Sequence, residues 1–170
     1  MKKTNRFGNM IMDYLVDNNL VKSKFCYFNA TKGSKCVSFF FDNKEYNLYI
    51  KYSKTFDRDK RGDRKCSFQF TYNELNKIKW YTSENNNVYI AFICTTKNLR
   101  GTEVIFISVN NVLKILGSDI VNTTKNIYIK HIKSKQHFKV WGTMLDEIDA
   151  LKIKKGFDRI CKSEKQKLIA

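Results

Sequence analysis

The sequence predicts an α+β fold: a mixed β-sheet flanked by an N-terminal helix and short helices, followed by a C-terminal β-hairpin and helix. Three observations predict it. Apolar residues recur at helical spacing near the N-terminus, apolar segments of strand length follow, and 42% of the 170 residues are hydrophobic. That fraction is sufficient for a core, so we expect a globular protein of about one domain.

The first element is a helix over residues 5–19. Its apolar residues recur at i, i+3, i+4, i+7 and i+8, which places them on one helical face. They are Phe7, Met10, Ile11, Tyr14 and Leu15. The adjacent Asn18 and Asn19 favour an end to the helix there.

Short apolar or alternating segments predict the strands that follow. In chain order they span residues 25–30, 36–41, 46–53, 67–70, 88–94 and 103–109. Thr71 and Glu74 form a capping box that begins a short helix, and residues 110–116 have the pattern of one or two further helical turns. We expect the strands to form one mixed sheet of about six or seven members.

A polar stretch over residues 117–126 divides the chain. Residues 1–116 are the predicted α+β core, and residues 117–170 are a hairpin and helix packed on the same domain. The hairpin strands alternate over residues 126–132 and 137–142. The helix follows from about Thr143, and its predicted inner face carries Met144, Ile148 and Leu151.

The five cysteines are scattered, odd in number and without a CxxC pair. We expect small buried hydrophobes in a reducing compartment, with a zinc site assembled from distant residues as the alternative. No apolar run approaches the ~20 residues of a membrane span, and acidic residues interrupt the N-terminal stretch where a signal peptide needs apolar ones. We therefore expect a cytoplasmic protein that does not associate with membranes.

The charge is strongly basic. The chain has 32 Lys and Arg residues against 16 Asp and Glu residues, a net charge of +16. Such an excess is typical of proteins that bind polyanions, with nucleic acid first. A coding bias toward Lys and Asn is the alternative, but it does not explain the shortage of acids.

The order of elements suggests a family. A helix, a strand hairpin with Lys51 in its second arm, a charged loop, a strand, a short helix and paired apolar strands follow one another. This order resembles the PD-(D/E)XK, or restriction-endonuclease-like, nuclease superfamily over about residues 5–116. Those nucleases place an Asp on one strand and a Glu or Gln two residues before a Lys on the next. The resemblance implies that carboxylates hold Mg²⁺ while the lysine helps to activate water.

The chain departs from that pattern at its ligand positions. Lys51 matches the lysine, but Tyr49 stands where Glu or Gln is expected, and Ser38 or Phe39 where the Asp is expected. Met12 occupies the position of a helical glutamate. Phenol, hydroxyl and thioether groups are poor ligands for Mg²⁺. The resemblance therefore implies a degenerate site that needs no metal or other cofactor.

Two alternatives remain for this region. A Mg²⁺-dependent endonuclease with displaced ligands would use Asp13, Asp42, Glu45 and Lys51. Alternatively, Lys51 is an ordinary strand lysine on a solvent-facing side.

Two basic segments are candidate nucleic-acid contacts. The first comprises Lys51, Lys54, Arg58, Arg61 and Arg64. Its three arginines are spaced by three residues, so they would follow a phosphate backbone if the loop became helical on binding. The alternative is a solvated loop whose aspartates cancel part of its charge.

The second segment surrounds the C-terminal hairpin. Its lysines are Lys125, Lys130, Lys133, Lys135 and Lys139. Tyr128 and Trp141 lie among them, and basic residues interleaved with aromatic ones suit phosphate contacts and base stacking, although packing in a core is the alternative. His131 and His137 form a weaker hypothesis, the catalytic pair of a metal-independent ribonuclease.

These observations together predict a protein that binds DNA or RNA through a basic face of a nuclease-like fold without cleaving it. One alternative is the Mg²⁺-dependent nuclease described above. Another is a small basic inhibitor that docks on a nucleoprotein complex. Paired apolar strands are also typical of dimers, so a homodimer is a further alternative.

Overall fold

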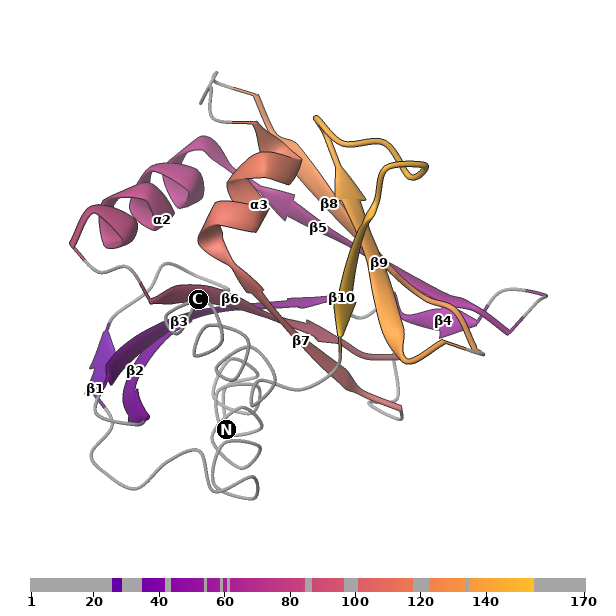
Figure 1. Ribbon diagram of the computed structural model, residues 1–170, viewed down its shortest axis with the longest axis horizontal. Helices are drawn as coiled ribbons and strands as arrows, with labels where there is room; N and C mark the ends of the chain where they lie inside the picture. The colour runs from indigo at the N-terminus through magenta and orange to yellow at the C-terminus, as the bar shows by residue number, and fades with distance from the viewer. Residues whose placement is uncertain are drawn as a thin grey trace, which may run out of the picture.

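The computed structural model describes residues 26–28, 35–41, 44–53, 55–58, 60, 62–84, 87–96, 101–117, 123–133 and 135–154. These residues form an α+β fold of two five-stranded sheets and two helices. The sheets pack on either side of a shared core, with the helix α3 between them at one end (Figure 1). The predicted helix over residues 5–19 lies outside the described residues.

The first sheet is mixed and has the order β1-β2-β3-β6-β7. Neighbouring strands are antiparallel except β3 and β6, which are parallel. The crossover connection that a parallel pair requires is supplied by β4, β5 and α2, which lie between them in the chain. The strands are β1 (Cys26–Phe28), β2 (Lys35–Phe41), β3 (Lys44–Ser53), β6 (Val88–Cys94) and β7 (Glu103–Ser108). Each lies where the sequence predicted a strand.

The second sheet is antiparallel throughout and has the order β10-β9-β8-β5-β4. Its strands are β4 (Asp57–Arg58), β5 (Arg64–Phe70), β8 (Lys125–His131), β9 (His137–Gly142) and β10 (Leu151–Lys154). The predicted C-terminal hairpin is the β8–β9 pair. Its strand β8 pairs with β5, so the last third of the chain and the middle third share one sheet.

Both helices begin where local sequence signals place them. For α2 (Tyr72–Glu84), the amide of Glu74 donates to the hydroxyl of Thr71, and the amide of Thr71 donates to the Glu74 carboxylate at 2.9 Å. This reciprocal pair is the predicted capping box. For α3 (Val109–Leu116), the hydroxyl of Ser108 accepts from the amide of Asn111. Neither described helix has the length and apolar character that crossing a bilayer requires.

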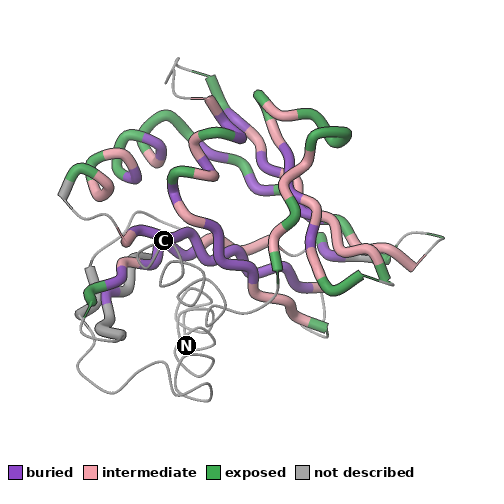
Figure 2. Tube along the Cα trace, viewed as in Figure 1, coloured by how far each residue is buried: buried purple, intermediate pink, exposed green. Residues whose placement is uncertain are grey.

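The core is built from the inward faces of the two sheets. Phe68 of β5 packs edge-on against Phe92 of β6, with ring centroids 4.7 Å apart. All residues of β6 are buried, which explains the continuous apolar run in that segment (Figure 2). A disulfide between Cys66 of β5 and Cys94 of β6 joins the two sheets through this core. The expectation of unpaired cysteines is therefore wrong for this pair.

Two expectations about the sheet and the C-terminus are also wrong. The strands divide into two sheets instead of one of six or seven members. The helix predicted from Thr143 is instead a series of turns followed by β10. Met144 and Ile148, expected on an inner helical face, are 67% and 94% exposed. The alternation of Leu151 and Ile153 with lysines is the pattern of a strand, and it pairs residues 151–154 with β9.

Candidate nucleic-acid interface

Lys51 lies on β3 and faces the second sheet. Its Nζ lies 2.8 Å from Oε1 of Glu74 and donates to the carbonyl of Gln69 at 2.6 Å. The same nitrogen lies 4.2 Å from the ring centroid of Phe70. Only 11% of the Lys51 side chain is exposed, so the alternative of a solvent-facing strand lysine is wrong. Lys51 instead joins the first sheet to the point where β5 leads into α2.

Glu74 is the centre of this arrangement. Its carboxylate accepts hydrogen bonds from Lys51, from the hydroxyl of Tyr49 at 3.3 Å, and from the amide and hydroxyl of Thr71. Tyr49 and Lys51 share a strand face because they are two residues apart. The position that would carry a metal-binding carboxylate in the nuclease pattern thus carries a phenol that binds the same glutamate as the lysine.

Burial and hydrogen bonding set the protonation of this pair. Burial lowers the pKa of Lys51, and the hydrogen bond and charge of Glu74 only partly offset it. For Glu74, burial alone raises the pKa, but the hydrogen bonds from Lys51 and Thr71 outweigh burial and leave the pKa below its ordinary value. The carboxylate is therefore held in its charged form.

The remaining ligand positions do not assemble around Lys51. Ser38 donates its hydroxyl to the Asn47 side chain. Glu45 is exposed at the start of β3, six residues from Lys51, or about 20 Å along the strand. Asp13 and Asp42 lie outside the described residues. Among the residues that the structure describes, no three His, Cys, Asp or Glu side chains gather as metal ligands would.

In its described part, the basic segment before β5 pairs with β5 as an antiparallel strand. Arg58 of β4 stands opposite Arg64 of β5. Arg64 donates to the carbonyl of Gly101 at 3.0 Å and lies over the ring of Phe56, so it lies on the face of the sheet that is turned toward the core. Arg58 and Arg64 therefore lie on two paired strands here; that the loop becomes helical on binding stays a prediction, and Lys54 and Arg61 lie outside the described residues.

The outward face of the second sheet carries a different set of basic residues. Lys65 of β5 stands opposite Lys130 of β8, Lys130 opposite Lys139 of β9, and Lys139 opposite Lys152 of β10. Residues directly opposite in antiparallel strands point to the same face. These four lysines, here called the lysine row, cross the sheet at right angles to its strands over about 14 Å.

Two acidic residues in the described part of the chain adjoin the four lysines of the lysine row. Lys130 lies 3.3 Å from the carboxylate of Asp63, and this is the one salt bridge that the described residues provide to the row. Asp57 stands at the register position beyond Lys65 on β4. Like charges directly opposite on a sheet are destabilising. The row therefore keeps an excess of positive charge, which favours the binding of an anion.

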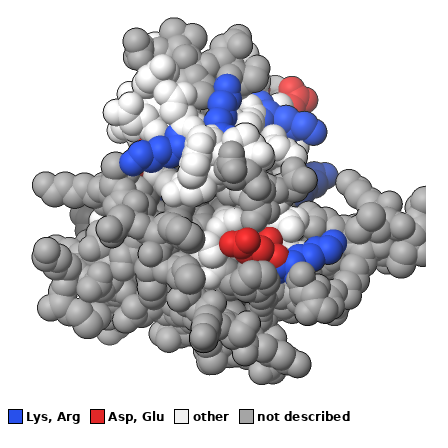
Figure 3. Space-filling model, turned by 90° about the vertical axis from the view of Figure 1, so that its left-hand side faces the viewer, with Lys and Arg blue, Asp and Glu red and all other residues white. Residues whose placement is uncertain are grey.

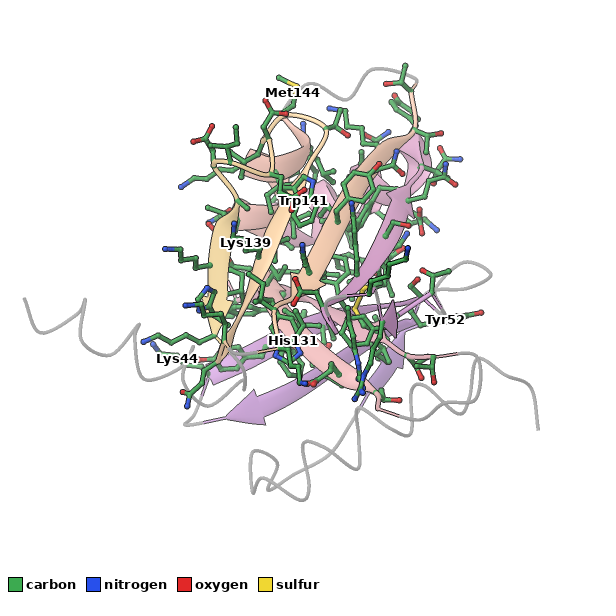
Figure 4. The ribbon with its side chains drawn as sticks, turned by 90° about the vertical axis from the view of Figure 1, so that its right-hand side faces the viewer. Lys44, Tyr52, His131, Lys139, Trp141 and Met144 are labelled. Carbon is green, nitrogen blue, oxygen red and sulfur yellow. A yellow bond between two sulfur atoms is a disulfide. The ribbon has the colours of Figure 1, made fainter. Side chains whose placement is uncertain are left out.

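An aromatic pair lies beside the lysine row. Tyr128 stands opposite Trp141, and their rings are stacked with centroids 5.7 Å apart. Nζ of Lys65 lies 4.9 Å and 4.8 Å from the two ring centroids. Figure 4 shows Lys139 and Trp141 along β9, with Met144 beyond Trp141. The hairpin thus places Tyr128 and Trp141 on the same face as Lys130 and Lys139, and Lys65 reaches the two rings from β5.

The β8–β9 turn extends the positive charge. Lys133 and Lys135 are exposed there, and the amide of Lys133 donates to Asp63 at 3.2 Å. The two histidines lie on opposite faces of the sheet, since His131 packs on the buried Phe138 while His137 alternates outward. The hypothesis of a catalytic histidine pair is therefore wrong.

Lys125 does not belong to this face. It is 5% exposed, and its Nζ donates to the carbonyl of Leu116 at 2.7 Å. It caps the C-terminal end of α3, where a cation is favourable. The expectation that Lys125 joins the basic patch is wrong.

Sequence reasoning missed three residues of these sites. The sequence pattern places Lys65 in the charged loop before residue 67 and Lys152 in the expected C-terminal helix, although the alternation of residues 151–154 is that of a strand. Glu74 was identified as a capping residue only, because its contact with Lys51 joins segments 23 residues apart.

Two other described regions differ from the lysine row. On the face that carries α2, the described Lys and Arg side chains do not form a row, and Asp or Glu side chains lie beside some of them (Figure 3). Beyond Trp141, the loop between β9 and β10 exposes Asp146, Glu147 and Asp149. The positive region of the sheet therefore has an acidic border on one side.

No family model, curated protein or solved structure matches the chain.

Proposed function

We propose that this protein binds nucleic acid through the lysine row on the outward face of β5, β8, β9 and β10, and that it does so without cleavage. The observation that carries the proposal is the alignment of Lys65, Lys130, Lys139 and Lys152 across four strands. Phosphates spaced along a nucleic acid backbone relieve the repulsion among such lysines. The net charge of +16 favours the same class of ligand.

The absence of cleavage is argued from Lys51. A nuclease lysine must reach a phosphate or an attacking water, but Nζ of Lys51 is engaged by Glu74 and by the carbonyl of Gln69. Its counter-charge is a capping residue whose carboxylate already accepts three further hydrogen bonds. Both groups therefore have structural partners that support a stabilising role.

The resemblance to the PD-(D/E)XK superfamily remains part of the proposal. The β2–β3 hairpin, the return of the chain through α2 and the parallel β3–β6 pair support it. In this interpretation a structural ion pair, between Lys51 and Glu74, occupies the place of the nuclease site. Binding has moved to a separate sheet.

Fluorescence anisotropy with end-labelled oligonucleotides tests the proposal. A Lys139→Glu/Lys152→Glu variant should bind about tenfold more weakly or worse, since each lysine is exchanged for a repelling charge. Lys77→Glu/Lys114→Glu is the matched control, because it makes the same change in net charge at exposed helical positions. Equal losses in both variants, or no binding by the unaltered protein, would reject the interface.

A further inference from the structure

We infer that the nucleic acid is single-stranded, with its phosphates on the lysine row and a base stacked on Tyr128. This inference rests on the proposed function and names its ligand class. It is carried by the order of side chains across the outward face: lysines, then aromatic rings, then an acidic loop.

The lysine row and the aromatic pair are parallel. Tyr128 precedes Lys130 by two residues on β8, and Trp141 follows Lys139 by two residues on β9. Two residues of a strand span about 7 Å. A nucleotide places its phosphate and its base on opposite sides of the sugar, so one strand can lay its backbone along the lysines and a base over the rings.

Lys65 covers the rings in the unbound protein. Its Nζ lies within 4.9 Å of the Tyr128 centroid and 4.8 Å of the Trp141 centroid. Lys65 is exposed and belongs to the lysine row, so a phosphate placed on the row competes with the rings for its ammonium group. Movement of Lys65 toward the phosphate uncovers Tyr128, which is half-buried, whereas Trp141 lies deeper, at 6% exposed.

The acidic loop disfavours a duplex. A second backbone lies on the far side of the base pairs, which here is the side of Asp146, Glu147 and Asp149. A duplex also keeps its bases stacked on one another, so their faces are closed to a protein ring. A single strand meets neither obstacle, and stacking on aromatic residues is the usual way in which proteins hold it.

Polar groups near the aromatic pair suit a ligand with exposed bases. Ser67 stands opposite Tyr128 on β5, and Gln69 and Asn126 stand opposite each other two residues further along. Ser67 and Gln69 are exposed. They offer donors and acceptors to a base edge or sugar without fixing a sequence.

Tryptophan fluorescence can report on the rings directly. The chain has two tryptophans, and Trp80 is 60% exposed on α2, so Trp80→Phe leaves Trp141 as the reporter. The three probes are a short single-stranded oligonucleotide, the duplex of the same sequence, and inorganic polyphosphate, which has charge but no bases. We expect the single strand to change the fluorescence and to bind about tenfold more tightly than the duplex at one salt concentration.

Variants of Tyr128 separate stacking from charge. Tyr128→Leu should weaken single-strand binding about tenfold and leave polyphosphate affinity unchanged, while Tyr128→Phe should restore single-strand binding. Duplex binding as tight as single-strand binding overturns the inference but leaves the proposed function standing. This comparison is made on the protein with Tyr128 unchanged. Unaltered single-strand binding by Tyr128→Leu overturns the stacking. Failure of all three probes to bind rejects the proposed function itself.

Discussion

Nζ of Lys51 lies 2.8 Å from Oε1 of Glu74, and this ion pair joins β3 of one sheet to the first turn of α2 beside the other sheet. The pair accounts for a lysine on an otherwise core-like strand. Its partner is the carboxylate that caps α2. Lys51, a candidate catalytic residue by sequence, thus has a structural role that stability measurements can test.

We predict that Glu74→Gln lowers the free energy of unfolding by about 2 kcal/mol. The change leaves the ammonium group of Lys51 largely buried without a counter-charge and weakens the capping box. Urea denaturation followed by circular dichroism measures the effect. Glu45→Gln, at an exposed position on the same strand, should change stability by less than about 0.5 kcal/mol. Similar losses for the two variants would contradict a specific role for Glu74.

The stabilisation by Glu74 should disappear in acid. Its pKa in the folded protein lies below the ordinary value of 4.5, so the unfolded chain takes up the proton first as the pH falls. The contribution is therefore complete above pH 4.5 and is lost as the pH falls through the folded pKa.

The difference in unfolding free energy between the unaltered protein and Glu74→Gln measures this loss. It should shrink between about pH 7 and about pH 2. A difference that stays constant over that range would show that the carboxylate charge is not what stabilises the pair. The lowered pKa of Lys51 acts in the alkaline range, where deprotonation relieves the unfavourable burial of its charge, so it leaves the acid measurement undisturbed.

The Cys66–Cys94 disulfide should stabilise the fold. It closes a loop with a sequence separation of 28, for which restriction of the unfolded chain contributes about 3 to 4 kcal/mol. Reductant should therefore lower the melting temperature of the unaltered protein but not that of Cys66→Ala/Cys94→Ala. If both sulfurs react with an alkylating agent in the unfolded, unreduced protein, the bond is absent.

The parts of the fold that depend on residues close together in the sequence could be predicted. The Thr71–Glu74 capping box begins α2, and the alternation around residues 126–142 forms the β8–β9 hairpin. The division into two sheets could not be predicted, because β5 pairs with β8, which follows only after α2, β6, β7 and α3.

The C-terminal helix shows how a short pattern misleads. Met144, Ile148 and Leu151 have helical spacing by coincidence, and two of the three are exposed. The lysine row is invisible in the sequence for a related reason. Lys65 and Lys152 belong to segments that meet only through the register of two intervening strands, so no local signal connects them.

The most direct test of the lysine row is the salt dependence of binding to a single-stranded oligonucleotide. For single strands, the slope of log affinity against log salt is about −0.7 per neutralised phosphate. Lys139→Gln/Lys152→Gln should therefore reduce the magnitude of the slope by about 1.4 between about 50 and 200 mM salt, and Lys77→Gln/Lys114→Gln should not change it. Equal slopes for the unaltered protein and the Lys139/Lys152 variant would contradict phosphate binding by the lysine row.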